Sequence, residues 1–143
     1  MDSEATGYFI EDIEEGMSAT YTRTVTDADI RQFADISGDN NPVHLDEEFA
    51  AKTRFETRIA HGMLSASFIS TVVGTRLPGY GAIYLKQNLK FTGPVRIGDT
   101  VETVATVTDV NRAKRRVTLE TVCRVDGKSV IEGDALMMVP SRG

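Results

Sequence analysis

Apolar residues follow two different periods in this sequence, and the change of period separates a helical part from a strand-rich part. Residues 19–25 alternate between apolar and polar side chains, which favours a strand. A helix is predicted next, because residues 26–29 are similar to a capping box with an acidic first turn, and Ile30 and Phe33 share one face. Gly38 then ends this helix.

A loop and two further helices are predicted for the middle of the chain. The loop covers residues 39–44, and Asp46 can cap a short acidic helix over residues 47–51. A long apolar helix follows at about residues 61–77 and ends at Pro78-Gly79. Its side chains are apolar or small around nearly the whole circumference, so we expect this helix to be buried rather than to lie on a surface.

Four strand-like runs fill the remainder of the chain, and tight turns join them. The runs cover residues 82–91, 95–110, 116–125 and 130–139. Turn residues such as Thr92-Gly93-Pro94 and Asp126-Gly127 predict that successive strands are antiparallel. Gly98-Asp99 bends or begins the second run, because the apolar alternation shifts phase there. We therefore predict an α+β fold in which an antiparallel sheet curls around the long helix.

Length and composition are ordinary for a globular protein. The 143 residues are 41% hydrophobic and 26% charged, so we expect one domain spanning residues 1–143 with a core that needs no cross-links. The net charge is −5 and the basic residues are scattered, which argues against nucleic acid as a partner. The one basic cluster, residues 112–116, is interpreted as a solvated hairpin.

Cysteine usage and the chain's first residues bear on the compartment. A single cysteine excludes an intrachain disulfide and suits a reducing environment. Cys123 lies in an alternating apolar run, so we interpret it as a small core residue and not a nucleophile. The acidic start does not have the charge of a signal peptide, and no segment approaches the ~20 apolar residues of a membrane span. We therefore expect a cytoplasmic protein with no membrane partner.

Both histidines of the chain lie within one short region, and the first is close to an aspartate. In the segment SGDNNPVH, residues 37–44, Asp39 and His44 stand five positions apart around an Asn-Pro turn. Such a pair can move protons near neutral pH. Each also has a structural alternative, because Asp39 could close an Asx-turn and His44 could make a structural hydrogen bond.

Two further interpretations of this loop follow from residue type. Pro42 keeps Asn41 extended, so Asn41 is expected to support the loop by hydrogen bonding rather than to take part in chemistry. A metal site is not predicted, because no third or fourth ligand stands at a plausible spacing from the Asp-His pair.

The same segment carries a resemblance to a known family. Residues 33–44, FADISGDNNPVH, with Ala50 six positions further on, resemble the signature of the MaoC-like (R)-specific enoyl-CoA hydratases. The sequence AHGM at residues 60–63 and the strand IYLKQNLKF at residues 83–91 are similar to that family in order and spacing. The similarity spans about residues 16–140.

The resemblance implies a hot-dog fold, in which a five-stranded antiparallel sheet wraps a long central helix. It also implies a homodimer with its active sites near the subunit interface, a coenzyme A thioester as substrate, and no cofactor. The implied reaction is the reversible syn addition of water to trans-2-enoyl-CoA, which gives (R)-3-hydroxyacyl-CoA. In such metabolism the product would feed polyester (polyhydroxyalkanoate) synthesis or fatty-acid breakdown.

The resemblance also assigns roles to individual residues. Asp39 and His44 would activate the water, and a serine at the position of Ser70 would assist the aspartate, although a helical serine more commonly bonds to its own helix. Val73 would border the acyl chain, or be an ordinary core residue. The backbone N–H of Gly62, at a helix N-terminus, could bind the thioester carbonyl, or this glycine could merely allow close packing.

Three other residues are assigned to substrate binding or to the pocket. His61 is expected to cap the helix or line the pocket rather than carry protons. Lys86 and Lys90 share one face of their strand and could meet coenzyme A phosphates, or simply be solvated.

Other functions stay open at this point. The chain could act on a branched, dicarboxylic or acyl-carrier-protein thioester, or be a non-catalytic thioester-binding subunit. A hot-dog thioesterase is disfavoured, because those enzymes lack the loop that carries Asp39 and His44.

Overall fold

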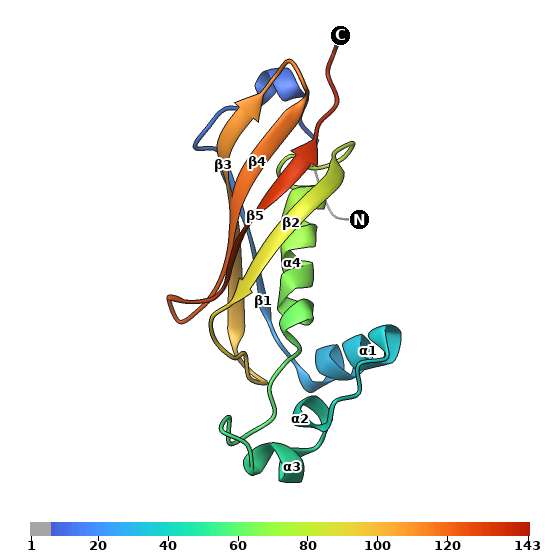
Figure 1. Ribbon diagram of the computed structural model, residues 1–143, viewed down its shortest axis with the longest axis vertical. Coiled ribbons are helices and arrows are strands. Elements are labelled where there is room, and N and C mark those ends of the chain that lie inside the picture. Colours follow the sequence, from blue (N-terminus) through green and yellow to red (C-terminus); the bar gives the residue numbers. More distant parts are fainter. Residues whose placement is uncertain (1–6) are drawn as a thin grey trace.

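The computed structural model describes residues 7–143, which form a curved sheet, one long helix and a group of short helices (Figure 1). In chain order the elements are η1 Ile10–Asp12, β1 Ser18–Thr24, α1 Asp27–Ser37, α2 Pro42–Leu45, α3 Glu47–Ala51, α4 Gly62–Thr75, β2 Ile83–Phe91, β3 Thr100–Asn111, β4 Arg116–Val125 and β5 Lys128–Met138.

The five strands form one antiparallel sheet in the order β1-β3-β4-β5-β2. The sheet curves along one side of α4, and α1, α2 and α3 lie beyond the end where α4 begins (Figure 1). A long helix held by a curved five-stranded antiparallel sheet is the hot-dog fold, so the predicted fold is confirmed. No helix among residues 7–143 is long and apolar enough to cross a membrane.

The side of α4 that faces the sheet supplies much of the core. Ile69, Val72 and Val73 are fully buried, and two apolar clusters extend from them over the inner face of the sheet. Within one chain α4 is not buried on nearly all sides as predicted, because the sheet covers only one side of the helix. Met63 and Ser70 belong to a stripe that stays exposed on the other side.

Most turn signals act as the sequence predicts, with one difference at the start of β3. Asp126 and Gly127 have φ values of 51° and 79° and close the β4–β5 hairpin. The second strand does not begin at residue 95. It begins at Thr100, so Gly98-Asp99 begins the strand, which is one of the two alternatives that the sequence offers. Gly98 (φ 92°) turns the chain, and the Asp99 carboxylate accepts a bond from the Arg96 N–H at 2.8 Å.

The edge strand β2 approaches its neighbour β5 unusually closely at one point. A Cβ built on Gly133 of β5 would lie 1.9 Å from the carbonyl oxygen of Asn88 in β2. The register between these strands also shifts between Tyr84 and Lys86, which interrupts the alternation expected along β2. Both features shape the strand that lies beside the open face of α4.

The caps of the short helices are mostly those that the sequence indicates. Thr26 and Asp29 form a capping box at the start of α1, and Asp46 accepts the Phe49 N–H at the start of α3. Residues 39–44 are not all loop, however, because Pro42 opens the one-turn helix α2. Proline suits the first position of a helix, and the Asn41 side chain accepts the N–H of Val43 at 3.1 Å.

Candidate active site

The helix α2 sets the position of His44, and a distant segment locks it in place. His44 lies in the single turn of α2, where its side chain is 8% exposed. The Arg58 guanidinium donates to the carbonyl oxygen of His44 at 2.6 Å and to Asp27 of α1, also at 2.6 Å. The N–H of Ile59 donates to the carbonyl of Val43 at 3.3 Å. Residues 58 and 59 therefore fasten α2 against the rest of the site.

One hydrogen bond fixes which nitrogen of His44 is available for chemistry. His44 Nδ1 lies 2.8 Å from the carbonyl oxygen of Ile59. Because a carbonyl can only accept, Nδ1 carries the proton, and Nε2 of the neutral ring has a free lone pair. Burial lowers the pKa of His44 below its usual value, and the neighbouring His61 adds to this effect, whereas the Ile59 bond and the charge of Asp39 oppose it.

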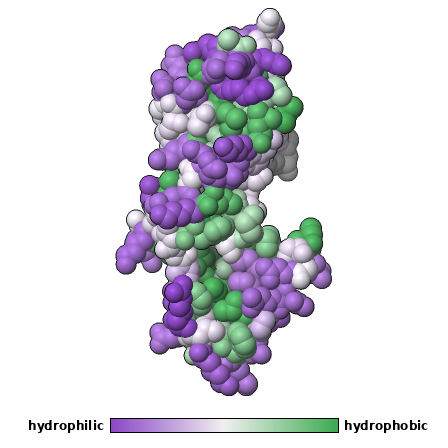
Figure 2. All heavy atoms as spheres, viewed as in Figure 1, coloured by the Kyte–Doolittle hydropathy of each residue, from purple (hydrophilic) through white to green (hydrophobic). Residues whose placement is uncertain are grey.

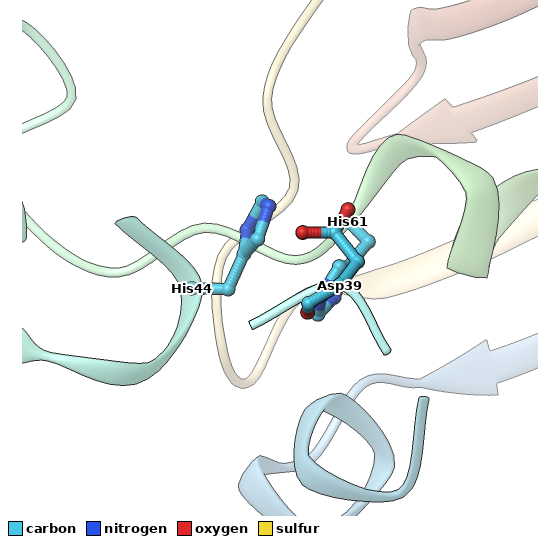
Figure 3. Close-up of side chains that lie close together, drawn as sticks. All are labelled: Asp39, His44 and His61. Carbon is cyan, nitrogen blue, oxygen red and sulfur yellow. The ribbon is translucent and has the colours of Figure 1, made fainter. Parts of the chain in front are cut away.

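The Asp39 carboxylate lies next to this ring and remains exposed to solvent. One ligand atom each from Asp39, His44 and His61 lies within 4.8 Å of the other two. Asp39 and His44 point into the same space beside the N-terminus of α4 (Figure 3). The N–H of Asn41 donates to Asp39 Oδ1 at 3.3 Å, so the expected Asx-turn is present as well. The turn orients the carboxylate and leaves its second oxygen available.

His61 contacts both Asp39 and His44 directly, which its expected pocket-lining role does not require. Its ring stacks on that of His44, with centroids 3.8 Å apart and planes at 27°. Its Nε2 lies 2.9 Å from the backbone carbonyl oxygen of Asp39. His61 occupies the N-cap position of α4, but among residues 7–143 its side chain makes no capping bond. The capping interpretation of His61 was therefore wrong.

His61 also supplies the third potential metal ligand that the spacing along the sequence did not reveal. The stacked geometry is nevertheless unsuited to a metal ion. The lone pair of an imidazole lies in the plane of its ring, so two nearly parallel rings do not direct their lone pairs at one point. In addition, His61 Nε2 and His44 Nδ1 are both engaged with carbonyl oxygens. The cluster fits proton chemistry better than coordination.

The N-terminus of α4 opens into a cavity of about 530 Å³. Gly62 lines it, and the first N–H groups of a helix have no carbonyl partner within the helix. A Cβ at residue 62 would lie 2.7 Å from the ring of Phe91, so glycine is also needed for close packing. Both interpretations of Gly62 are therefore supported. His61 lines the same cavity, whereas Asp39 and His44 are not among its lining residues and adjoin it through their contacts with His61.

Four other predicted residues do not meet Asp39 and His44 within one chain. Ser70 lies two turns beyond Gly62, about 12 Å along α4, and lines a different hollow together with Lys86. Val73 is fully buried in the core, as its structural alternative holds. Lys90 is exposed on β2 and does not line the Gly62 cavity. The alternation of apolar and polar residues along the sequence could not show how far these residues lie from Asp39 and His44 in the fold.

The cavity at the N-terminus of α4 is also lined by two residues that the sequence analysis did not identify. Ser65 is 1% exposed, and its hydroxyl has no hydrogen-bond partner within the described part of the chain. Its spacing of four from His61 on one helix face was the available signal. Arg54 lines the same cavity, with its guanidinium 4.9 Å from the ring centroid of Phe55. No pattern in the sequence distinguished Arg54 from other surface cations.

Comparisons with known proteins show the family and the fold of this chain. The model of the MaoC-like domain family matches residues 9–129. An (R)-specific enoyl-CoA hydratase of Rhodospirillum rubrum is 57% identical over 136 residues, which cover 95% of this chain and 94% of that protein.

Two solved structures are similar in both sequence and fold. The unliganded R-hydratase of Pseudomonas aeruginosa is 43% identical with a TM-score of 0.90, and the alignment covers 95% of this chain and 88% of that one. The (R)-hydratase of Aeromonas caviae involved in PHA biosynthesis is 40% identical with a TM-score of 0.89, covering 91% and 99%.

Proposed function

The chain belongs to the MaoC-like domain family, and from this premise we infer that it is an (R)-specific enoyl-CoA hydratase in which His44 and Asp39 activate water. It is a hydro-lyase that adds water to trans-2-enoyl-CoA and gives (R)-3-hydroxyacyl-CoA. The observation that carries the residue assignment is the bond from His44 Nδ1 to Ile59, since it leaves Nε2 unprotonated beside the Asp39 carboxylate.

His44 acts as the base in this scheme. Its Nε2 takes a proton from a water that Asp39 holds, and the oxygen of that water forms a bond to C3 of the enoyl group. The double-bond electrons move toward the thioester oxygen, where the Gly62 N–H donates to the negative charge. The imidazolium then returns the proton to C2 from the same face, which gives syn addition. The carboxylate of Asp39 stabilises the imidazolium between the two steps.

The lowered pKa of His44 supports the base role. A ring whose neutral form is favoured by burial is unprotonated at neutral pH and can accept a proton. The opposite assignment, with Asp39 as the base and His44 as the acid, would require His44 to start as an imidazolium with protons on both nitrogens. Burial and the neighbouring His61 both disfavour that charge.

The assay is hydration of crotonyl-CoA, followed by loss of the enoyl absorbance, with chiral analysis of the product. Asp39→Asn and His44→Ala should each lower kcat by roughly 10²–10⁴-fold, the range for loss of general acid–base catalysis. Circular dichroism of both variants should match that of the parent protein. Release of free thiol would instead indicate a thioesterase. Near-normal turnover by either variant would refute the assignment of these residues.

The acyl carrier and the pathway belong to the same proposal. The relatives that act on coenzyme A thioesters favour that carrier, and the A. caviae enzyme involved in PHA biosynthesis favours a role in supplying monomers for polyester synthesis. Comparison of crotonyl-CoA with crotonyl-acyl carrier protein tests the first point. A kcat/KM at least as high for the carrier protein would contradict it.

We also propose that the protein is a homodimer in which the open face of α4 and the edge strand β2 are covered by a second copy. Three large apolar side chains on this surface are exposed, namely Met63 (54%), Ile83 (54%) and Leu85 (42%). Met63 and Leu85 line a hollow of about 540 Å³ together with Ser70. Exposed apolar surface of this kind is typical of an interface. In such a dimer, Ser70 and Lys86 would lie at the contact between the subunits.

A further inference from the structure

We propose that His61 is a positioning residue, which holds Asp39 and His44 in their catalytic arrangement without exchanging a proton with the substrate. This inference rests on the proposed function of the site. It differs from the pocket-lining role that the sequence suggests for His61, because it predicts an effect on turnover and not on substrate affinity.

The first contact that carries the proposal is with the backbone of Asp39. Because the carbonyl of Asp39 can only accept, the Nε2 of His61 donates to it across 2.9 Å. Asp39 is an exposed residue on a short segment between α1 and α2, and this bond connects it to the base of α4. The bond fixes the chain position from which the carboxylate extends.

The second contact is with the ring of His44. The two imidazoles stack at 3.8 Å, while the ring of Phe33 packs against His61 at 4.9 Å and 55°. One side chain from the start of α4 thus touches α1, the Asp39 segment and α2. A displacement of about 1 Å at a catalytic group can cost 10²-fold in rate, so such a contact has a catalytic consequence.

The surroundings of His61 explain why it does not carry the proton itself. The side chain is only 2% exposed. Its Nδ1 is buried with no hydrogen-bond partner among residues 7–143, and its Nε2 is already engaged with Asp39. Neither nitrogen is open to a substrate. The charged and titratable groups that face the stacked pair are the Asp39 carboxylate and the Arg58 guanidinium, the latter through the carbonyl of His44.

Three substitutions separate the two contacts. His61→Phe keeps a ring against His44 but removes the donor to Asp39. His61→Gln keeps an amide donor at a similar reach but removes the stacked ring. His61→Ala removes both contacts. We expect kcat on crotonyl-CoA to fall about 100-fold in the Ala variant and about 10-fold in each of the others, with KM within about threefold of the parent value.

The pH profile provides a readout that a merely structural role would not move. Replacing His61 by alanine opens the site and removes a neighbour that lowers the pKa of His44. The acid limb of kcat/KM should therefore move to higher pH in this variant. The same shift should appear in an NMR titration of the remaining histidine, which needs no turnover.

The outcomes distinguish this inference from the proposed function. If the parent protein fails to hydrate any enoyl-CoA, the proposed function is wrong whatever His61 does. If the parent is active and the folded Phe and Ala variants keep its kcat, the positioning role is refuted. A raised KM with unchanged kcat would refute it too, because it would make His61 a substrate-binding residue. Should the Ala variant unfold, the Phe and Gln variants still decide the question.

Discussion

A single backbone carbonyl determines what His44 can do. Without the bond to Ile59, either nitrogen of the ring could carry the proton, and the site would lack a defined base. The sequence places Asp39 and His44 together through their spacing and the family signature. It does not specify the tautomer, because Ile59 lies fifteen residues away and meets His44 only when the chain folds.

The buried state of His44 also makes stability depend on pH. Its pKa is lowered in the folded protein from an ordinary value of 6.5, so the unfolded chain binds a proton more readily. The stabilising contribution is complete above pH 6.5 and is lost as the pH falls toward the folded pKa. We expect the free energy of unfolding, measured with urea at fixed protein concentration, to decrease between pH 7.5 and pH 5.

A matched variant isolates this effect. His44→Gln keeps a polar side chain of similar reach but cannot titrate, so its loss of stability over the same pH range should be smaller. Asp27 and Asp29 have pKa values lowered by their arginine partners, and their contributions are lost only at lower pH, below about 3.8. Equal slopes for the parent and the His44 variant would contradict the prediction.

Local signals in the sequence predict the elements well, and contacts between distant elements explain the errors. The capping box of Thr26 and Asp29 and the turn at Gly127 depend on neighbouring residues, so their patterns are informative. The contact of His61 with Asp39 joins residues twenty-two positions apart, and no periodic pattern in the sequence indicates it. The open side of α4 was mispredicted for the same reason, because composition shows that a helix is apolar but not how far a sheet reaches around it.

Two glycines provide a test of how the edge strand is held. Gly133→Ala would place a Cβ 1.9 Å from the carbonyl of Asn88, so β2 and β5 must separate or shift. We expect a loss of about 1–3 kcal/mol in stability, the range for inserting an extra methyl group into closely packed structure. A Cβ on Gly74 of α4 meets nothing within 4 Å of its own chain, so Gly74→Ala should stabilise the single chain by about 0.5–1 kcal/mol through helix propensity.

Thermal unfolding of the two variants measures both effects. Gly133→Ala should lower Tm and Gly74→Ala should raise it or leave it unchanged. If Gly133→Ala left Tm unaltered, the close approach of β2 to β5 would not be a constraint on the fold. The Gly74 variant then serves as the control for the general effect of adding a methyl group.

The molecule as a whole exposes large apolar side chains on α4 and β2, among them Met63, Ile83 and Leu85. In the space-filling view, hydrophobic residues reach the surface in patches among hydrophilic ones (Figure 2). The strand β2 is at the edge of the sheet, and no other strand within residues 7–143 pairs with its outer side. An apolar edge left in this state would promote aggregation, and a second copy of the chain would cover it in a defined way.

The proposed dimer predicts a definite mass in solution and a definite way to change it. Light scattering after gel filtration should give twice the mass of one chain.

Leu85→Glu would bury a carboxylate at the proposed contact, and because an unpaired buried charge is costly, the mass should fall toward that of one chain. Ile97→Glu is the matched control. Ile97 is 41% exposed in the turn before β3, where the N–H of Gly98 donates to the carbonyl of Val25 beside β1, the edge of the sheet opposite β2, so this variant should keep the parent mass. A monomeric parent protein would refute the proposed dimer, and a Leu85 variant that stays dimeric at micromolar concentration would place the contact elsewhere. Because the active sites are expected near the interface, the dissociated Leu85 variant should also lose hydratase activity, while the Ile97 variant keeps it.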